Sequence, residues 1–367
     1  MSRHGNDPTQ FSQGLAGKIA LKLATGVKIS KPRLMARSGI NHIKGRIGLR
    51  VPRQIHIAIT NKCNLNCEHC FASHLDQGAD KQLTHDDFAE IYRQSNKMGA
   101  YGYHFTGGEP LMRADFEDII RIFQPQKRYI SFITNASLLD RDRIRRFKQI
   151  GVDCIAISLD SGFAEEHDRF RGKQGLFDNA MDCFRIMHEE GIQPITCVTV
   201  TDGTVQSRSF LELVDKAARA GVSVHVNYGV RIGNWEGNED IIFSSQGKAF
   251  LMDLIAKSKH VFREEMFTYG KWGCPAMKEL IYITAFGDVI PCPYIHVSFG
   301  NIRQEPLETI WKRALGYKVF SEYAPLCLSG EDPLFNEKII PATWVDKPPI
   351  SYKAVEKELR ELDAHYE

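Results

Sequence analysis

Three closely spaced cysteines have the clearest chemical potential in this sequence. Cys63, Cys67 and Cys70 lie within eight residues in the spacing C-x3-C-x2-C, directly after the apolar run 55–60. We therefore expect them on a loop that leaves a buried strand. Cysteine thiolates are the usual ligands of iron–sulfur clusters. Three of them leave one iron of a [4Fe–4S] cube without a protein ligand, and an open coordination position is typical of catalytic metal sites.

Two other interpretations of this run stay open from the residues alone. Structural zinc sites usually combine paired C-x2-C motifs, or cysteines with spaced histidines, whereas this run has one C-x2-C pair and no evident fourth ligand. Disulfides are disfavoured, because nothing marks the chain as secreted. Six of the nine cysteines fall into two spaced groups, and in a reducing cytoplasm that pattern favours metal binding.

The composition is that of an ordinary globular protein, long enough for one large domain or two smaller ones. The 367 residues are 43% hydrophobic and 25% charged. A net charge of +2 gives no electrostatic reason to expect a nucleic-acid partner. We find no run of eighteen apolar residues and no signal peptide, so we expect a cytoplasmic protein.

The amino-terminal segment 1–53 is basic, and we expect a helical lead-in. No Asp or Glu occurs from Pro8 to Cys67, against eleven Lys and Arg. Four apolar residues recur at every fourth position and indicate an amphipathic helix: Leu15, Ile19, Leu23 and Val27. This basic N-terminal helix either packs on the catalytic domain with a solvated face or makes a peripheral contact with a membrane or an anionic substrate. We favour the first.

A regular alternation of strand and helix patterns occupies residues 54–232. Apolar or β-branched runs end near six positions: Thr60, Thr106, Thr134, Ser158, Val200 and Asn227. Helical patterns lie between them, at 86–98, 116–123, 141–150, 177–190 and 210–220. This alternation predicts an α/β fold in which helices cover a parallel sheet, a partial (β/α)6 TIM-like barrel. In such barrels chemistry gathers at the carboxyl ends of the strands.

The alternation stops after residue 232, and a small α+β domain is predicted for 233–340. Its expected elements are helices at 247–258 and 307–315 and a hairpin at 280–292. A carboxy-terminal tail, 341–367, follows and contains a charged helix at 352–364.

Polar motifs stand at the ends of the predicted strands. The second strand ends in Gly107-Gly108-Glu109-Pro110, where paired glycines let a ligand approach the backbone and the carboxylate can hold a cationic amine. Asn135 follows the third strand and can bind a ribose hydroxyl or cap the next helix.

Taken together, the cysteine spacing, the aromatic ring of His69 before the third cysteine and the Gly-Gly-Glu-Pro segment resemble the radical S-adenosylmethionine (SAM) enzymes. The resemblance implies that the cysteine triad holds a catalytic [4Fe–4S] cluster whose open iron chelates the amino and carboxylate groups of SAM. An electron from the cluster then cleaves SAM to methionine and a 5′-deoxyadenosyl radical. It also implies that Gly107, Gly108 and Glu109 contact the amino group of SAM, and we place His69 and Asn135 with them at the cofactor.

Ser158 and Arg171 complete the expected SAM site. Ser158 ends the fourth strand and Arg171 follows thirteen residues later. This resembles the members of the family that carry cluster-binding C-terminal extensions, in which a Ser and an Arg help to bind SAM. A guanidinium matches the geometry of a carboxylate, and Asp160 can orient Arg171 or cap the following turn.

A second group of cysteines lies in the carboxy-terminal part. Cys274, twelve residues, Gly287, four residues and Cys292 are followed by Cys327. This spacing resembles the start of the SPASM/twitch extension, which carries auxiliary iron–sulfur clusters. The four further cysteines of a complete SPASM domain are absent from the sequence, so one auxiliary [4Fe–4S] cluster is expected, with the three cysteines as ligands. Its fourth ligand would be a side chain such as His296 or the substrate; alternatively, these are buried structural cysteines.

Three cysteines are left over: Cys154, Cys183 and Cys197. Core packing is the expectation for each, although Cys197 on a barrel strand would be placed to donate a hydrogen atom to a substrate radical.

These observations predict a radical SAM enzyme that abstracts a hydrogen from its substrate. We expect a small molecule, such as a sugar, a nucleoside or a lipid-linked intermediate, with a ribosomally made peptide as the alternative. An electron donor such as a flavodoxin or ferredoxin is implied. The alternative from another class is a non-enzymatic iron–sulfur or zinc scaffold or electron carrier.

Overall fold

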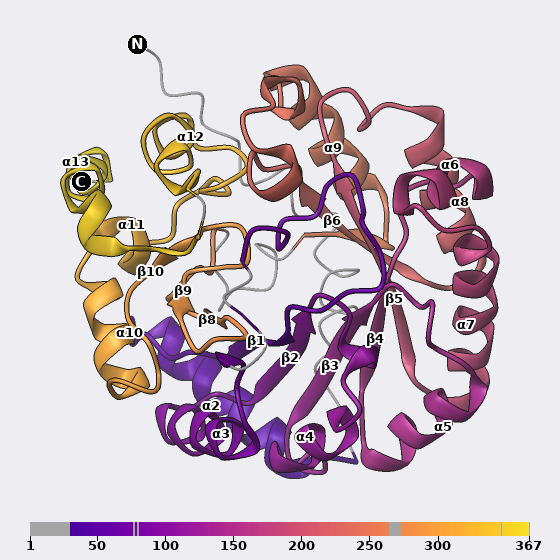
Figure 1. Cartoon of the computed structure of the whole chain (residues 1–367), viewed down its shortest axis with the longest axis horizontal. Coiled ribbons are helices and arrows are strands. Elements are labelled where there is room, and N and C mark those ends of the chain that lie inside the picture. Colours follow the sequence, from indigo (N-terminus) through magenta and orange to yellow (C-terminus); the bar gives the residue numbers. More distant parts are fainter. Residues whose placement is uncertain (1–29, 76–77, 79–80, 264–272, 346, 367) are drawn as a thin grey trace.

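A single curved sheet forms the centre of the molecule (Figure 1). The computed structural model describes residues 30–75, 78, 81–263, 273–345 and 347–366. The sheet has nine strands in the order β7-β6-β5-β4-β3-β2-β1-β8-β9. The six predicted strands are all present: β1 (Gln54–Thr60), β2 (Gly102–Gly107), β3 (Tyr129–Thr134), β4 (Cys154–Ser158), β5 (Gln193–Val200) and β6 (Ser223–Tyr228). Each pairs in parallel with its sequence neighbour, which confirms the predicted α/β fold.

Helices cover the outer face of this sheet (Figure 1). They are α3 (His85–Met98), α4 (Phe116–Ile122), α5 (Arg141–Ile150), α6 (Ala164–Arg171), α7 (Leu176–Glu190) and α8 (Arg208–Arg219). Local chemistry sets their ends: Thr84 and Asp87 form a capping box at the start of α3, and Gly99 ends this helix with a φ of 111°. Only α6 was not among the expected helices.

Aromatic packing joins the sheet to these helices. Five phenylalanines form a buried chain of tilted and edge-to-face contacts with ring centroids 4.8–5.8 Å apart: Phe105, Phe116, Phe123, Phe132 and Phe147. They come from β2, α4, β3, α5 and the end of α4, so this cluster fixes two helices against two central strands.

The expected C-terminal hairpin exists, but it belongs to the same sheet. β8 (Leu280–Ile283) pairs in parallel with β1, with Gln54 opposite Leu280, and β9 (Val289–Ile290) pairs antiparallel with β8. At the other edge β7 (Val261–Phe262) extends β6. The sheet is therefore longer than the predicted six strands, because the hairpin satisfies the edge of β1. The domain limits at 232 and 340 stay a prediction.

The rest of the carboxy-terminal part is mainly helical. It contains α9 (Ser245–Lys257), α10 (Leu307–Leu315), α11 (Lys318–Ser321), α12 (Pro333–Lys338) and α13 (Glu356–His365). The small strands β10 (Val297–Ser298) and β11 (Ile350–Ser351) pair with each other. Among the described helices, none is both long and apolar enough to cross a lipid bilayer.

The helix expected at residues 15–27 lies outside the described residues, but a second helix occupies the basic segment. α2 (Pro32–Arg46) is anchored by Lys31, whose ammonium group donates to the Asp153 carboxylate at 2.6 Å. It also donates to the carbonyl oxygens of Arg128 at 3.0 Å and Gly151 at 2.9 Å. These partners precede β3 and β4, so the anchor holds α2 at the amino-terminal end of the strands.

Replacing Lys31 with Met should destabilise the fold by about 3 kcal/mol, because the substitution removes the ammonium group that pairs with the buried Asp153 carboxylate at 2.6 Å. Urea unfolding followed by far-UV circular dichroism would measure the loss. Lys44→Met on the exposed face of α2 is the matched control and should change the free energy of unfolding by less than about 0.5 kcal/mol. Equal values for the two variants would contradict the anchoring role.

Candidate active site

The cysteine loop leaves the carboxyl end of β1 and is held by two neighbouring segments. The segment after β6 holds it through two hydrogen bonds of Asn234. The side chain donates to the Cys67 carbonyl at 2.8 Å, and the backbone N–H donates to the Cys70 carbonyl at 3.0 Å. Gly233 lies so close that a Cβ there would be 2.1 Å from the Cys70 oxygen. On the other side the Glu68 amide donates to the Phe170 carbonyl at the end of α6.

Two side chains reach the thiols themselves. The side-chain nitrogen Nδ2 of Asn135 lies 4.0 Å from the Cys63 sulfur and donates to Asn64 Oδ1 at 3.0 Å. Arg171 Nη1 lies 3.6 Å from the Cys67 sulfur. The structure thus brings residues expected at the SAM site, from β3 and α6, to the cysteine loop after β1.

Asp160 orients Arg171 through a bidentate contact. Arg171 Nε donates to Oδ2 at 2.6 Å and Nη2 donates to Oδ1 at 3.0 Å. Burial alone would raise the pKa of Asp160, but Arg171 and His167 hold it well below its usual range. The guanidinium is therefore fixed beside an ionised carboxylate with one nitrogen left for the cysteine loop. Ser158 stands two residues before Asp160, half-buried at the end of β4.

His69 is a half-buried aromatic side chain of the cysteine loop. Its ring stacks on Phe170 with centroids 4.8 Å apart and lies 5.6 Å from the Trp235 ring. Burial lowers the pKa of His69 to about 4, so the ring is neutral. Its Nδ1 is buried and has no hydrogen bond among the described residues.

The paired glycines are required where the segment after β2 approaches the start of the cysteine loop. A Cβ on Gly107 would lie 2.1 Å from the Thr60 oxygen, and one on Gly108 would lie 2.2 Å from the Lys62 oxygen. The Gly108 and Glu109 amides donate to these same carbonyl groups, each at 2.8 Å. The glycine pair therefore admits the backbone that leads into Cys63; its contact with the SAM amine stays a prediction.

The Glu109 carboxylate is 1% exposed and already accepts three protein hydrogen bonds. Oε1 accepts from the Thr134 hydroxyl at 2.7 Å and from the backbone N–H of Leu111 at 3.0 Å. Oε2 accepts from the backbone N–H of Asn135 at 2.8 Å. Burial raises the pKa of Glu109 despite these bonds. Its visible role is to hold the end of β3, and with it Asn135, against the Gly-Gly-Glu-Pro segment; contact with the SAM amine stays a proposal.

The second cysteine group lines a large cavity inside the barrel. Its volume is about 450 Å³, and its wall includes Cys274, Cys292 and Cys327. Ser329 also lines it; its hydroxyl lies 3.8 Å from the Cys327 sulfur and hydrogen-bonds Cys292. His296, the suggested fourth ligand, has its Nε2 3.1 Å from the Pro293 carbonyl oxygen, and its role as a ligand stays a prediction.

Three histidines face the same cavity and were missed from the sequence. His56, His104 and His225 stand on β1, β2 and β6, with the first two directly paired and their ring centroids 4.8 Å apart. Burial lowers the pKa of His104 to about 4 and that of His56 well below its usual range, so both are neutral. The sequence did contain a pattern that could have revealed them. A histidine occupies the third position of each of the three strands, QIHIAIT, GYHFTG and SVHVNY.

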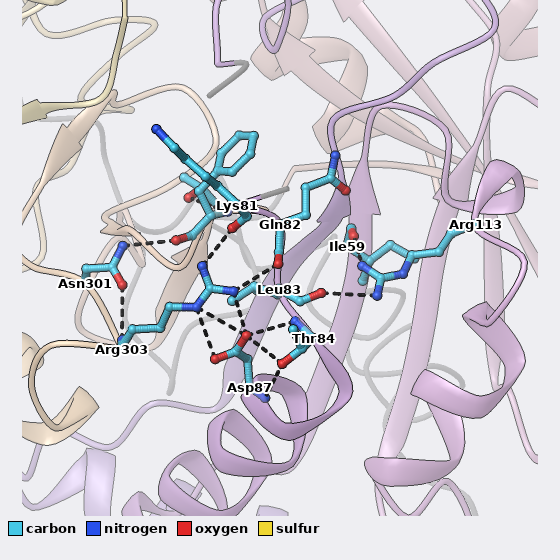
Figure 2. Close-up of polar contacts among 11 residues, drawn as sticks. Ile59, Lys81, Gln82, Leu83, Thr84, Asp87, Arg113, Asn301 and Arg303 are labelled. Carbon is cyan, nitrogen blue, oxygen red and sulfur yellow. Dashed lines mark hydrogen bonds and ion pairs between the residues drawn. The ribbon is translucent and has the colours of Figure 1, made fainter. Parts of the chain in front are cut away.

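An arginine from the carboxy-terminal part fastens the segment that follows the cysteine loop (Figure 2). Arg303 donates to the carbonyl groups of Lys81 at 2.7 Å and Gln82 at 2.9 Å and to the Asp87 carboxylate at 2.7 Å. From the barrel side, Arg113 donates to Ile59 at 2.6 Å and Leu83 at 3.1 Å. These contacts join the carboxy-terminal part to the segment that leads into α3.

The residues fit iron–sulfur clusters. Burial raises the pKa of the Cys63 and Cys67 thiols, so thiolates at these positions need a positive partner, which iron supplies. In the part of the chain that the structure describes, no three His, Cys, Asp or Glu side chains converge tightly enough for one metal ion. A cube binds each thiolate through a different iron and so spreads the three sulfurs.

Comparison with known families agrees with this geometry. Residues 57–217 match the model of the radical SAM superfamily, and residues 274–329 match that of the SPASM iron–sulfur cluster-binding domain. The chain belongs to the radical SAM superfamily. It is therefore an enzyme, with a [4Fe–4S] cluster and SAM as cofactors and a SPASM extension that implies auxiliary iron–sulfur chemistry. This decides against the non-enzymatic carrier.

Relatives of this radical SAM enzyme span most of its length. It is 26% identical over 294 residues to the AdoMet-dependent heme synthase of Methanosarcina barkeri, covering 72% of this chain and 83% of the relative. It is 28% identical to the Fe-coproporphyrin III synthase of the same organism, covering 69% and 72%. The crystal structure of Streptococcus suis SuiB bound to S-adenosylmethionine has the same fold, with a TM-score of 0.59, 19% identity and coverage of 78% and 72%.

Glu109→Gln should weaken SAM binding by about tenfold, because the amide NH2 group replaces one carboxylate oxygen and then faces a donor, either the Asn135 backbone N–H or the Thr134 hydroxyl, which loosens the end of β3. Equilibrium dialysis with the anaerobically reconstituted protein would measure the dissociation constant. Glu117→Gln, on the outer side of the barrel in α4, should leave it unchanged. The same affinity in both variants would remove Glu109 from the SAM site.

Iron analysis would assign the second cysteine group. The reconstituted protein should hold about eight irons, and Cys292→Ala should retain about four. His296→Gln should retain all of them, because that imidazole is bound to the Pro293 carbonyl. An unchanged iron content in Cys292→Ala would show that these cysteines are structural; a loss in His296→Gln with intact circular dichroism would restore the histidine as a ligand.

Proposed function

We propose that this radical SAM enzyme abstracts a hydrogen atom from a small molecule bound in the barrel cavity. One observation carries the proposal: a single cavity extends through the interior of the barrel to all three cysteines of the SPASM region. Phe71, the residue after Cys70, forms part of its wall. A substrate there lies close to both cysteine groups.

The proposed roles follow from the contacts. Cys63, Cys67 and Cys70 hold the catalytic cluster, which together with SAM supplies a 5′-deoxyadenosyl radical. Five residues at the carboxyl ends of the strands and one at the end of α6 position the cofactor: Gly107, Gly108, Glu109, Asn135 and Ser158, with Arg171 from the helix. The barrel wall keeps water from the reacting atoms. Cys274, Cys292 and Cys327 hold an auxiliary cluster that binds substrate or accepts an electron from it, which suits a net oxidation.

The wall chemistry favours an aromatic or apolar substrate over a sugar. Seven aromatic side chains line the cavity: Phe71, Tyr101, Tyr129, Tyr228, Phe262, Tyr282 and Tyr294. Its described wall has no Asp or Glu, and the guanidinium of Arg53 is paired with Glu279 at 2.9 Å. A substrate with anionic groups meets no repulsion there. Since relatives that cover 72% and 69% of this chain are named AdoMet-dependent heme synthase and Fe-coproporphyrin III synthase, a tetrapyrrole is the first candidate.

A peptide substrate is the second candidate. The structure of SuiB bound to its precursor peptide SuiA is similar to this chain, but at 18% identity it supports the fold alone. We favour the small molecule because the cavity lies inside the barrel with α2 residues at one end of its wall. We also propose a flavodoxin or ferredoxin as electron donor in a reducing, cytoplasmic setting, which keeps the thiols unoxidised.

The test is SAM cleavage after anaerobic reconstitution. With a strong reductant the protein should form 5′-deoxyadenosine, and Cys63→Ala/Cys67→Ala/Cys70→Ala should form none. Cys183→Ala is the matched control, since this thiol is buried in the core beside the Leu139 carbonyl and should leave cleavage intact. Equal 5′-deoxyadenosine from the triple variant would overturn the assignment of the cluster ligands.

The substrate is tested in the same assay with Fe-coproporphyrin III. It should increase 5′-deoxyadenosine formation in the parent protein but not in Ala156→Phe, whose ring fills part of the cavity. Cleavage without substrate should be similar in both. No stimulation of the parent would exclude this tetrapyrrole, and equal stimulation of both proteins would place the substrate elsewhere.

A further inference from the structure

Helix α2 has two different faces. Leu34, Ser38 and His42 point inward and form part of the cavity wall. The same side of the helix is tied to α3, where Arg37 donates to Asn96 Oδ1 at 2.5 Å and Asn41 donates to the Gly99 carbonyl at 2.8 Å. The position of α2 is therefore fixed, and its outer face is presented to the surroundings in one orientation.

The outer face is apolar. Ile40, Ile43 and Ile47 are spaced by three and four residues, so they form one stripe along the helix, and they are 54%, 63% and 70% exposed. Leu49, just beyond the helix end, is 52% exposed. Nine large apolar side chains are exposed among the described residues, and four of them are in this ten-residue stretch. Such clustering marks an interaction surface rather than scattered exposure.

Cations surround the stripe. Arg33, Lys44 and Arg46 are exposed on α2, and none of them forms an ion pair among the described residues. The chain has no acidic residue from Pro8 to Cys67, so no carboxylate of this segment neutralises them. The surface therefore combines exposed isoleucines with uncompensated positive charge, the composition of helices that lie in the interface of anionic membranes.

We propose that the outer face of α2 docks on an anionic lipid bilayer. A second copy of the chain fits less well, because a symmetric contact would bring Lys44 and Arg46 against their own counterparts. Docking places the bilayer on one side of α2 and the end of the substrate cavity on the other, separated by one helix. This goes beyond the proposed chemistry: the surface works whatever the substrate is.

The test is co-sedimentation of the full chain with vesicles. Binding is expected to vesicles of phosphatidylcholine and phosphatidylglycerol in equal parts, to fall with added salt, and to be weak on phosphatidylcholine alone. Ile43→Asp/Ile47→Asp should reduce binding by about tenfold or more, since it removes apolar contact and adds negative charge. Leu211→Asp, an equally simple change at an exposed residue of α8, is the matched control and should bind like the parent.

The double variant Ile43→Asp/Ile47→Asp must keep the iron content and the circular dichroism spectrum of the parent. A second double variant, Lys44→Glu/Arg46→Glu, spares the apolar stripe and should also lose vesicle binding. Three outcomes would overturn the proposal. The first is that the parent protein does not bind vesicles. The second is that both double variants still bind, which would assign binding to another part of the chain. The third is that light scattering finds the parent as a dimer and Ile43→Asp/Ile47→Asp as a monomer. None of these depends on SAM cleavage, so the two proposals fail independently.

Discussion

Between the ends of β1 and β2, the backbones of two loops touch at a distance that only glycine permits. The amides of Gly108 and Glu109 donate to the carbonyl groups of Thr60 and Lys62, and a Cβ on either glycine of the pair would collide with these oxygens. This contact sets where the cysteine loop begins. Everything else at the site adds to it: Glu109 holds the end of β3, and Asn135 from that end reaches Cys63.

The same loop is fastened from parts of the chain far away in sequence. Asn234, after β6, holds its carbonyl groups, and Arg171 stands beside Cys67 with Asp160 behind it. Arg303 of the SPASM region binds the segment 81–87 that follows. A parallel sheet makes this possible, because all its carboxyl ends lie at one edge and loops from β1 to β6 meet there.

The cavity is lined by side chains that the same strands point toward the interior of the barrel. Inward-facing positions that usually carry branched apolar residues here carry His56, His104 and Ser131, and they leave space between them. Imidazoles and aromatic rings form much of this wall and give it hydrogen-bonding capacity, and Arg53 and Arg263 add positive charge. α2 adds to this wall, and its anchor, the ion pair between Lys31 and Asp153, is buried.

The sequence alone determined the class of chemistry and most of the elements. Spacing of the triad, the glycine pair and the alternation of strands and helices are local properties, and the strand ends predicted from them, such as Thr60 and Ser158, match the structure. α2 was missed because an anchor 122 residues away fixes it. Tertiary structure alone decided that the C-terminal hairpin pairs with β1, that the glycine pair contacts the backbone before Cys63, that Ser329 lies beside Cys327, and that three histidines share one cavity. Each of these depends on which distant segments become neighbours, and no local pattern encodes that.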